Sequence, residues 1–403
     1  MRVTTDLGRI ALLVALGAVV VAITFATSDA HQGSDALFYE AQTEELQGAT
    51  AQEGREEWFS GPEARAAAVD EDEPEDKVRV LDPEWVEYSA QFYRRRWVVP
   101  AMSAAVDPIV GEERLRVVSV AGYLLIGPLL FLLLRLRFSP GTSLAVAAAC
   151  ILLPPVIDFC THRGVDSWGL ALEAASMLFL ALAVDRELTW IVPFALAMLV
   201  LSFTRDNTLA PLAGAALLLW RQRGDLRLRR RNLALTGTAF AASLPAPLIF
   251  GTPLRDQLAY AIDAFDVPTD TSWGYILTHY PNAAAHVVYY DLRYPVEHAF
   301  SWVATPFLVL MLVGLAGSLW VLLRHAPRDD PYFTLAQGAF AGGLVLLLIA
   351  VNYQSYRLEL IWLPCVAVGA ALWMARQSGT PNTRRSQKEM PYTVARVTPS
   401  TRT

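Results

Sequence analysis

Cysteine, lysine and evenly spread charge are scarce in this chain, and each scarcity narrows what the protein can be. The only cysteines are Cys150, Cys160 and Cys365, which are odd in number and fit neither a disulfide framework nor a metal-ligand spacing. Charged residues make up 18% of the sequence and gather in a few clusters, whereas a large soluble protein would spread them along every helix. HExxH, P-loop, GxSxG and CxxC patterns are also missing, so none of the enzyme classes that they mark is indicated.

Long apolar runs take the place of charge. The 403 residues are 54% hydrophobic and have a mean hydropathy of +0.33. Runs near the length that crosses a bilayer, about 20 residues, recur from end to end. They do not alternate as barrel strands do, so lipid forces them to be helices. We therefore predict an all-α polytopic membrane protein with about ten transmembrane helices. The predicted spans are roughly 9–28, 115–134, 141–159, 168–184, 189–203, 208–220, 233–250, 300–323, 333–351 and 358–375.

Arginine placement predicts that both termini are cytoplasmic. The predicted inner connections hold most arginines, including a dense run from Arg221 to Arg231, whereas the short outer connections hold one each. An arginine run of this kind can also bind nucleic acid, but next to a membrane span we interpret it as a topology determinant that lies beside anionic lipid. The apolar core of the first span exceeds the about 7–15 residues of a signal peptide, which favours a retained helix. The lysine-poor, Ala-, Leu- and Arg-rich composition suggests a bacterial protein, so we expect the inner (plasma) membrane and a role in the cell envelope.

The spans divide the chain into a membrane domain, residues 1–375, and a polar tail, residues 376–403, that we expect to be a disordered cytoplasmic segment. Two outer segments are too long to be simple connectors: a first loop at 29–114 and a second at 251–299.

Within the first loop, the acidic stretch 48–80 is typical of a solvated or disordered insertion. Trp85, Tyr88 and Phe92 share one face of a predicted interfacial helix. The second loop is rich in aromatic residues, which either anchor it at the interface or cover a binding site for a sugar or lipid.

Two acidic residues stand at outer helix ends, where charge near the bilayer is costly and therefore a functional hypothesis. Asp35 directly follows the first span and is a candidate general base for an acceptor hydroxyl. Asp166 precedes the fourth span and is a second candidate acid. Either residue can instead be an ordinary N-terminal cap of the following helix.

Five arginines on the same predicted side are candidate ligands for a phosphate. Arg94, Arg95 and Arg96 precede an apolar run, where lipid anchoring without specificity is the alternative. Arg205 is either a phosphate ligand or a structural partner of Asp206. Arg357 has the same two alternatives, with Glu359 as its structural partner.

This layout resembles the GT-C superfamily of membrane glycosyltransferases, which use polyprenyl-phosphate-linked sugars. The first match is Gly33–Ala41, where an acid after the first helix, Asp35, is followed by Tyr39. The aromatic–arginine–apolar–proline stretch at 92–100, the Thr-Arg-acid element at 204–206, and Tyr356-Arg357 before Pro364 are similar to further elements of the superfamily. The usual pair of adjacent acids is here Ser34-Asp35, so the acid role rests on Asp35 alone.

The resemblance implies an inverting glycosyltransferase that moves a sugar from a polyprenyl-phosphate donor to an acceptor on the extracytoplasmic side. Asp35 and Asp166 would be catalytic, and Tyr39, Arg94, Arg95, Arg96, Arg205 and Arg357 would bind substrate. The expected partners are membrane lipid, the lipid-linked sugar and a glycan, lipid or protein acceptor, with no nucleic acid.

No cofactor or metal site is evident from the sequence, although Asp35 and Asp166 would be able to share a divalent metal if the fold joins them. The alternatives are a transporter or flippase of lipid-linked or anionic solutes, a lipid-linked glycan ligase that works through the second loop, and a non-catalytic membrane scaffold.

Overall fold

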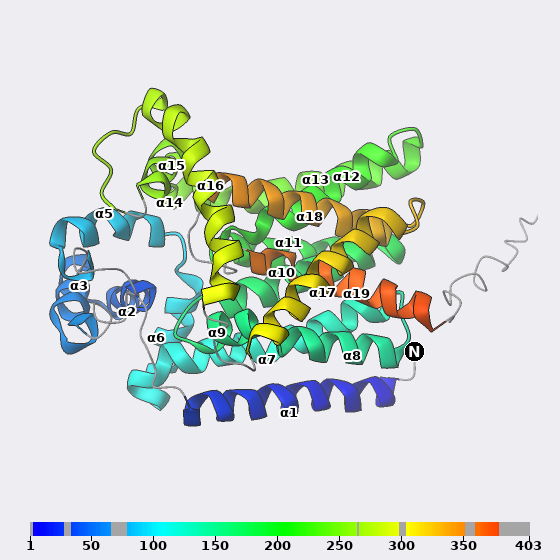
Figure 1. Ribbon diagram of the computed structural model, residues 1–403, viewed down its shortest axis with the longest axis horizontal. Coiled ribbons are helices and arrows are strands. Elements are labelled where there is room, and N and C mark those ends of the chain that lie inside the picture. The colour runs from blue at the N-terminus through cyan, green and yellow to red at the C-terminus, as the bar shows by residue number, and fades with distance from the viewer. Residues whose placement is uncertain are drawn as a thin grey trace, which may run out of the picture.

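The computed structural model describes residues 3–27, 34–65, 79–263, 266–297, 304–350 and 359–378. Every regular element in these ranges is a helix. Long helices lie side by side in one bundle, and shorter helices gather at one of its ends (Figure 1). The described chain is therefore all-helical, as the unbroken apolar runs predict.

The bundle contains a helix at each of the ten predicted ranges. They are α1 (Val3–Thr27), α7 (Arg114–Arg135), α8 (Pro140–Ile151), α10 (Asp166–Asp185), α11 (Ile191–Ser202), α12 (Leu209–Arg221), α13 (Leu226–Ser243), α17 (Ala304–His325), α18 (Pro331–Ala350) and α19 (Leu363–Gln377). Among the described residues, six helical stretches are long and apolar enough to cross a membrane, or seven if one bent pair is a single span. A multi-pass membrane protein follows from these helices, and the count of ten stays a prediction.

The bent pair is α8 and α9 (Pro154–Thr161), which meet at 62°. The sequence predicts one span over 141–159, but Pro154 and Pro155 stand in its last third. Proline removes a backbone donor and its ring clashes with the preceding turn, so the helix ends and restarts.

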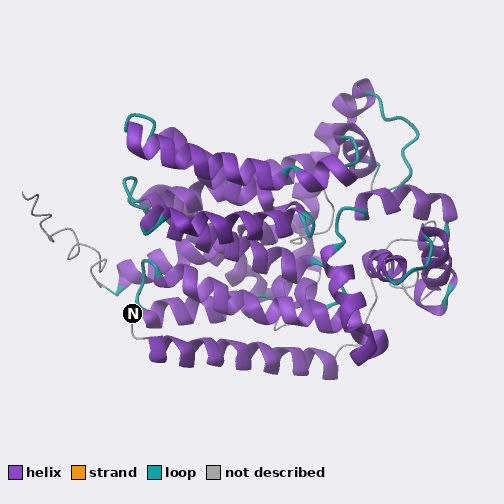
Figure 2. Cartoon of the chain, turned by 180° about the vertical axis from the view of Figure 1, so that it is seen from behind, coloured by secondary structure: helices purple, strands orange, loops and turns teal. Residues whose placement is uncertain are grey.

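The first loop forms a helical group at one end of the bundle (Figures 1 and 2). Its elements are α2 (Ser34–Leu46), α3 (Ala51–Ser60), η1 (Arg79–Leu81), α5 (Pro83–Tyr93) and α6 (Val98–Val110). The second long loop lies at the same end and includes α15 (Leu254–Ile262) and α16 (Trp273–Glu297). The short helix α14 (Pro245–Phe250), which continues the apolar stretch of α13, leads into it. The start of α1 and the end of α19 lie at the opposite end of the bundle, together with the turn between α12 and α13.

Part of the acidic stretch 48–80, expected to be solvated or disordered, is instead folded. Thr50 and Glu53 form a reciprocal capping box that starts α3, and such a box satisfies two backbone donors that a helix otherwise leaves open. Phe59 then packs against Phe38 of α2, with ring centroids 4.6 Å apart. The prediction of a solvated or disordered stretch rested on the acidic composition alone. The helix cap and this aromatic contact outweigh that composition. Residues 66–78 lie outside the described chain.

The aromatic face predicted for α5 packs against protein. Trp85 is buried beside Phe38, with ring centroids 5.7 Å apart. Phe92 stacks on Tyr260 of α15 at 4.5 Å, and the hydroxyl of Tyr260 lies 2.8 Å from that of Ser89. These contacts join the first loop to the second, so α15 covers part of α5.

Helices α12 and α18 approach each other through glycine. A Cβ atom on Gly338 would lie 2.6 Å from the carbonyl oxygen of Ala213 and from the Cα of Gly214, and one on Gly342 would clash with the backbone at Leu209. Small residues four apart allow such close contact between helices, which is a common source of association in membranes.

This contact predicts that Gly338→Ala destabilises the bundle by about 1–3 kcal/mol, the usual cost of overpacking, which thermal unfolding in detergent would measure as a lower melting temperature. Gly237→Ala on α13 is the matched control, because its Cβ would meet nothing within 4 Å. We expect the control to leave the melting temperature unchanged or slightly higher. Equal melting temperatures for the two variants would contradict the close packing.

Candidate functional site

The candidate base Asp35 meets Tyr93 at the end of the bundle that holds the first loop. Asp35 lies in the first turn of α2 and accepts a hydrogen bond from the hydroxyl of Tyr93, the last residue of α5. Phe38 stacks on the Tyr93 ring with centroids 4.3 Å apart. Burial raises the pKa of Tyr93 well above 10.0, and the negative charge of Asp35 raises it further. Tyr93 therefore stays protonated, and its hydroxyl orients the Asp35 carboxylate by donating a hydrogen bond to it.

Tyr39 and Arg96 form the next part of the site. Tyr39 is fully buried one turn after Asp35 on α2, and its hydroxyl accepts a hydrogen bond of 3.0 Å from Nη1 of Arg96. The Arg96 guanidinium also lies over the Tyr93 ring, 5.3 Å from its centroid, a cation–π distance. Although burial lowers the pKa of Arg96, the oxygens of Tyr39 and Asp206 and those of Tyr93 and Asp35 raise it overall, so the guanidinium is charged.

Arg95 joins the first loop to the bundle. It forms an ion pair with Asp206, in the turn between α11 and α12. Beside this pair, the backbone N–H of Val98 donates to the carbonyl of Phe203 at 3.4 Å, and the rings of Trp97 and Phe203 lie 5.5 Å apart. Burial lowers the pKa of Arg95, and the nearby Asp206 carboxylate acts in the opposite direction. The Arg94–Arg96 turn is therefore fixed against the break at 203–206.

Asp166 and Arg205 form a buried ion pair. The sequence offered Asp206 as the structural partner of Arg205, but Arg205 pairs with Asp166 instead. It also offered Asp166 as the N-cap of the following helix, but Val165 occupies the cap position of α10 and Asp166 is the first helical residue. Asp206 is instead the partner of Arg95. Val165 packs with Tyr39 and Val99 in one buried cluster, which places the Asp166 pair beside the first-loop residues.

Arg94, a further predicted ligand, takes no part in these contacts. Arg94 is exposed and lines a cavity of about 30 Å³ with Phe38 and Arg55, about the volume of one water molecule. Arg357 lies outside the described residues. Tyr93 and Asp206, in contrast, belong to the site although the sequence did not single them out as functional. The sequence did contain a signal for both residues, because Tyr93 directly precedes the Arg94–Arg96 run and Asp206 directly follows Arg205.

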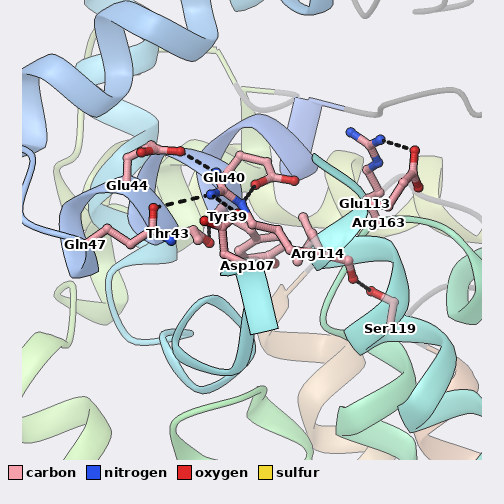
Figure 3. Close-up of polar contacts among 11 residues, drawn as sticks. Tyr39, Glu40, Thr43, Glu44, Gln47, Asp107, Glu113, Arg114, Ser119 and Arg163 are labelled. Atoms are coloured by element: carbon pink, nitrogen blue, oxygen red, sulfur yellow. Dashed lines mark hydrogen bonds and ion pairs between the residues drawn. The ribbon is translucent and has the colours of Figure 1, made fainter. Parts of the chain in front are cut away.

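A second cluster fixes the helix that carries Asp35 and Tyr39. Arg114, at the start of α7, donates to Glu40 at 3.0 Å, to Asp107 at 2.9 Å and to Glu44. Figure 3 shows these carboxylates converging on Arg114, with Glu40 and Glu44 projecting from successive turns of α2. One guanidinium thus serves three carboxylates, and it ties α2 to both α6 and α7.

No group of three or more histidine, cysteine, aspartate or glutamate side chains that would hold a metal ion is found within the residues that the structure describes. The two acids that the sequence suggested for a shared metal, Asp35 and Asp166, have different partners, Tyr93 and Arg205.

The sequence matches no protein-family model and no curated protein sequence. Function therefore has to be argued from the geometry of this site and from the motifs in the chain.

Glu40 gives the site a predicted pH dependence. It is fully buried, and burial raises the pKa of its carboxyl above the ordinary 4.5 despite Arg114. The folded state therefore holds this proton more tightly than the unfolded state does. That contribution to stability is complete below about pH 4.5 and is lost as the pH rises through the raised pKa.

Because Glu40→Gln cannot ionise, it should escape that loss, and its melting temperature relative to wild type should climb from pH 4.5 towards neutrality. Thermal unfolding of the detergent-solubilised protein across this range would measure the difference. Thr43→Ser, a non-ionisable change at a buried position of the same helix, is the control and should show a flat difference. A flat difference for Glu40→Gln as well would contradict the raised pKa.

Proposed function

We propose that this chain is a membrane glycosyltransferase that moves a sugar from a polyprenyl-phosphate donor to an acceptor on the extracytoplasmic side. The observation that carries the proposal is a partly buried arginine with uncharged direct partners beside a candidate base. Arg96 contacts the Tyr39 hydroxyl and the Tyr93 ring, and in the described chain its buried Nε has no hydrogen-bond partner. Tyr93 in turn donates to Asp35. A cation held in this way is suited to an anionic phosphate.

The pairing of charges ranks the candidate phosphate ligands. Asp166 compensates Arg205, and Asp206 compensates Arg95. Arg96 contacts no carboxylate of the described residues directly, although Asp206 and Asp35 lie near enough to favour its charged form. It therefore becomes the first candidate, ahead of Arg205. Arg95 and Arg205 would add positive potential around the leaving group, and Arg357 remains a candidate from the sequence alone.

The proposed reaction is a single displacement. Asp35 takes the proton of an acceptor hydroxyl as the hydroxyl oxygen attacks the anomeric carbon. The bond between that carbon and the phosphate oxygen breaks, polyprenyl phosphate leaves, and the anomeric centre inverts. A carboxylate has several acceptor positions, so Asp35 can retain the Tyr93 hydrogen bond while it receives the proton. Arg96 stabilises the negative charge that develops on the departing phosphate.

Asp166 is better suited to holding Arg205 than to taking a proton, because removing its charge would leave a buried arginine uncompensated. We therefore assign it a positioning role rather than the catalytic role that the sequence suggested.

The membrane orientation is part of the same proposal. The arginine-rich turns and both ends of the described chain lie at the end of the bundle opposite the site (Figure 1). By the positive-inside rule that end is cytoplasmic, which puts Asp35 and Arg96 on the outer face of a bacterial inner membrane.

A transporter has one observation in its favour. Glu173 lies fully buried within α10, one of the predicted membrane spans. A buried acid in a span is typical of ion and proton pathways. However, Glu173 is hydrogen-bonded to Asn207 beside Arg205, so a local role at the site explains it as well.

The proposed chemistry is tested by turnover in nanodiscs. Purified protein is given a panel of polyprenyl-phosphate sugars and a membrane glycan extract, and the release of polyprenyl phosphate is measured. We expect release by wild type, near-complete loss in Asp35→Asn, and a loss of about 10²–10³ in rate in Arg96→Gln, which removes a positioned charge. Arg223→Gln is the control, because Arg223 lies over the Trp220 ring in the turn between α12 and α13, at the opposite end of the bundle, and it should keep wild-type turnover.

Equal turnover by wild type and Asp35→Asn would retain the enzyme class but contradict the assignment of the base. Failure of folded wild-type protein to release the lipid phosphate from any donor would favour the transporter instead.

A further inference from the structure

One face of α10 carries three residues that hold the segment containing Arg205. Asp166, Gly169 and Glu173 are three and four positions apart, so they lie on the same side of the helix. Asp166 pairs with Arg205. A Cβ atom on Gly169 would lie 2.9 Å from Cδ of Arg205 and 3.3 Å from its Cβ. Oε2 of Glu173 accepts a hydrogen bond of 2.7 Å from Nδ2 of Asn207.

The held segment, residues 203–208, is a largely buried break between α11 and α12. It consists of a turn at 203–205 followed by the short 3-10 helix η4 (Asp206–Thr208). Thr204 is fully buried, and Arg205 and Asn207 are 8% and 3% exposed. The helices on either side, α11 and α12, have 12 and 13 residues, well short of the about 20 that cross a bilayer. Irregular backbone at membrane depth persists only where it is packed inside protein and its polar groups are satisfied. The α10 face provides that environment.

Glu173 itself is expensive to bury. It is 0% exposed, and within the described chain its Oε1 atom has no hydrogen-bond partner. Burying a partly satisfied carboxyl group opposes folding. The hydrogen bond from Asn207, two residues after Arg205, offsets part of this cost. That bond fixes the far side of the turn whose near side is fixed by Asp166.

We infer that Glu173 is a positioning residue for the Arg205–Asp206 turn, and that Gly169 provides the space for the Arg205 side chain. Through this turn Glu173 also acts on the first loop, because Asp206 holds Arg95 and the carbonyl of Phe203 accepts from Val98. The inference relies on the proposed function only for the chemical role of Arg205.

Hydrogen–deuterium exchange of the full-length protein in nanodiscs tests the positioning role without any turnover assay. In Glu173→Ala, amides of peptides covering 203–208 should exchange about tenfold faster or more, the consequence of losing a buried hydrogen bond to an acid. Glu173→Gln keeps a carbonyl acceptor for Asn207 and should retain wild-type exchange.

Ser176→Ala is the matched control, because Ser176 is buried one turn further along α10 and has no hydrogen-bond partner among the described residues. Peptides from α18 should exchange at the wild-type rate in all variants.

Asn207→Ala tests the same bond from the other side and serves if Glu173→Ala does not fold. It should accelerate the same peptides, and the double variant should accelerate them no more than either single variant, since both remove one interaction.

The inference is overturned if folded Glu173→Ala or Asn207→Ala leaves exchange at 203–208 unchanged, or if Glu173→Gln exchanges as fast as Glu173→Ala. Normal exchange with no sugar transfer by wild type would instead count against the proposed function alone.

Discussion

The structure depends on one constraint: a charge packed against an apolar helical bundle has to be paired. At the end that holds the chain's described termini, Arg137 donates hydrogen bonds to Asp185 at 2.9 Å and to Asp330 at 2.7 Å. These bonds join the turn between α7 and α8 to the end of α10 and to the turn between α17 and α18. At the other end Arg114 gathers three carboxylates, and Arg205 pairs with Asp166. Since removing one partner of a buried pair is strongly destabilising, these contacts set the relative positions of the helices and loops.

Arg96 differs from this pattern, and the fold explains how it can. Its turn is held on one side by the pair of Arg95 with Asp206, and on the other by Tyr93, which stacks on Phe38. The guanidinium is therefore ordered by its neighbours, and in the proposed function its charge serves the lipid phosphate. A cation that is fixed before the reaction stabilises a developing negative charge without reorganisation. Asp35 is close by, because it accepts a hydrogen bond from the same Tyr93 side chain.

Much of the fold was predictable, because apolar length decides where helices can form in lipid. The predicted spans 189–203 and 208–220 also left Arg205 in a break between two helices. Partners were not predictable: the pairs of Arg205 with Asp166 and of Arg95 with Asp206 join residues far apart in sequence. Composition misled at 51–60, where a local capping box and Phe59 build α3. Glu173 passed unnoticed because a single acid barely lowers the hydropathy of a span.

The central claim, that Arg96 keeps its charge for a lipid phosphate, is tested most directly by binding. The dissociation constants of polyprenyl phosphate and of the uncharged polyprenol of equal length would be measured for wild type and Arg96→Gln in nanodiscs. The account predicts that wild type binds the phosphate at least about tenfold more tightly, as expected for a charge-assisted hydrogen bond, and that Arg96→Gln loses this preference. Equal binding of the two lipids by wild type, or a preference that survives in Arg96→Gln, would contradict it.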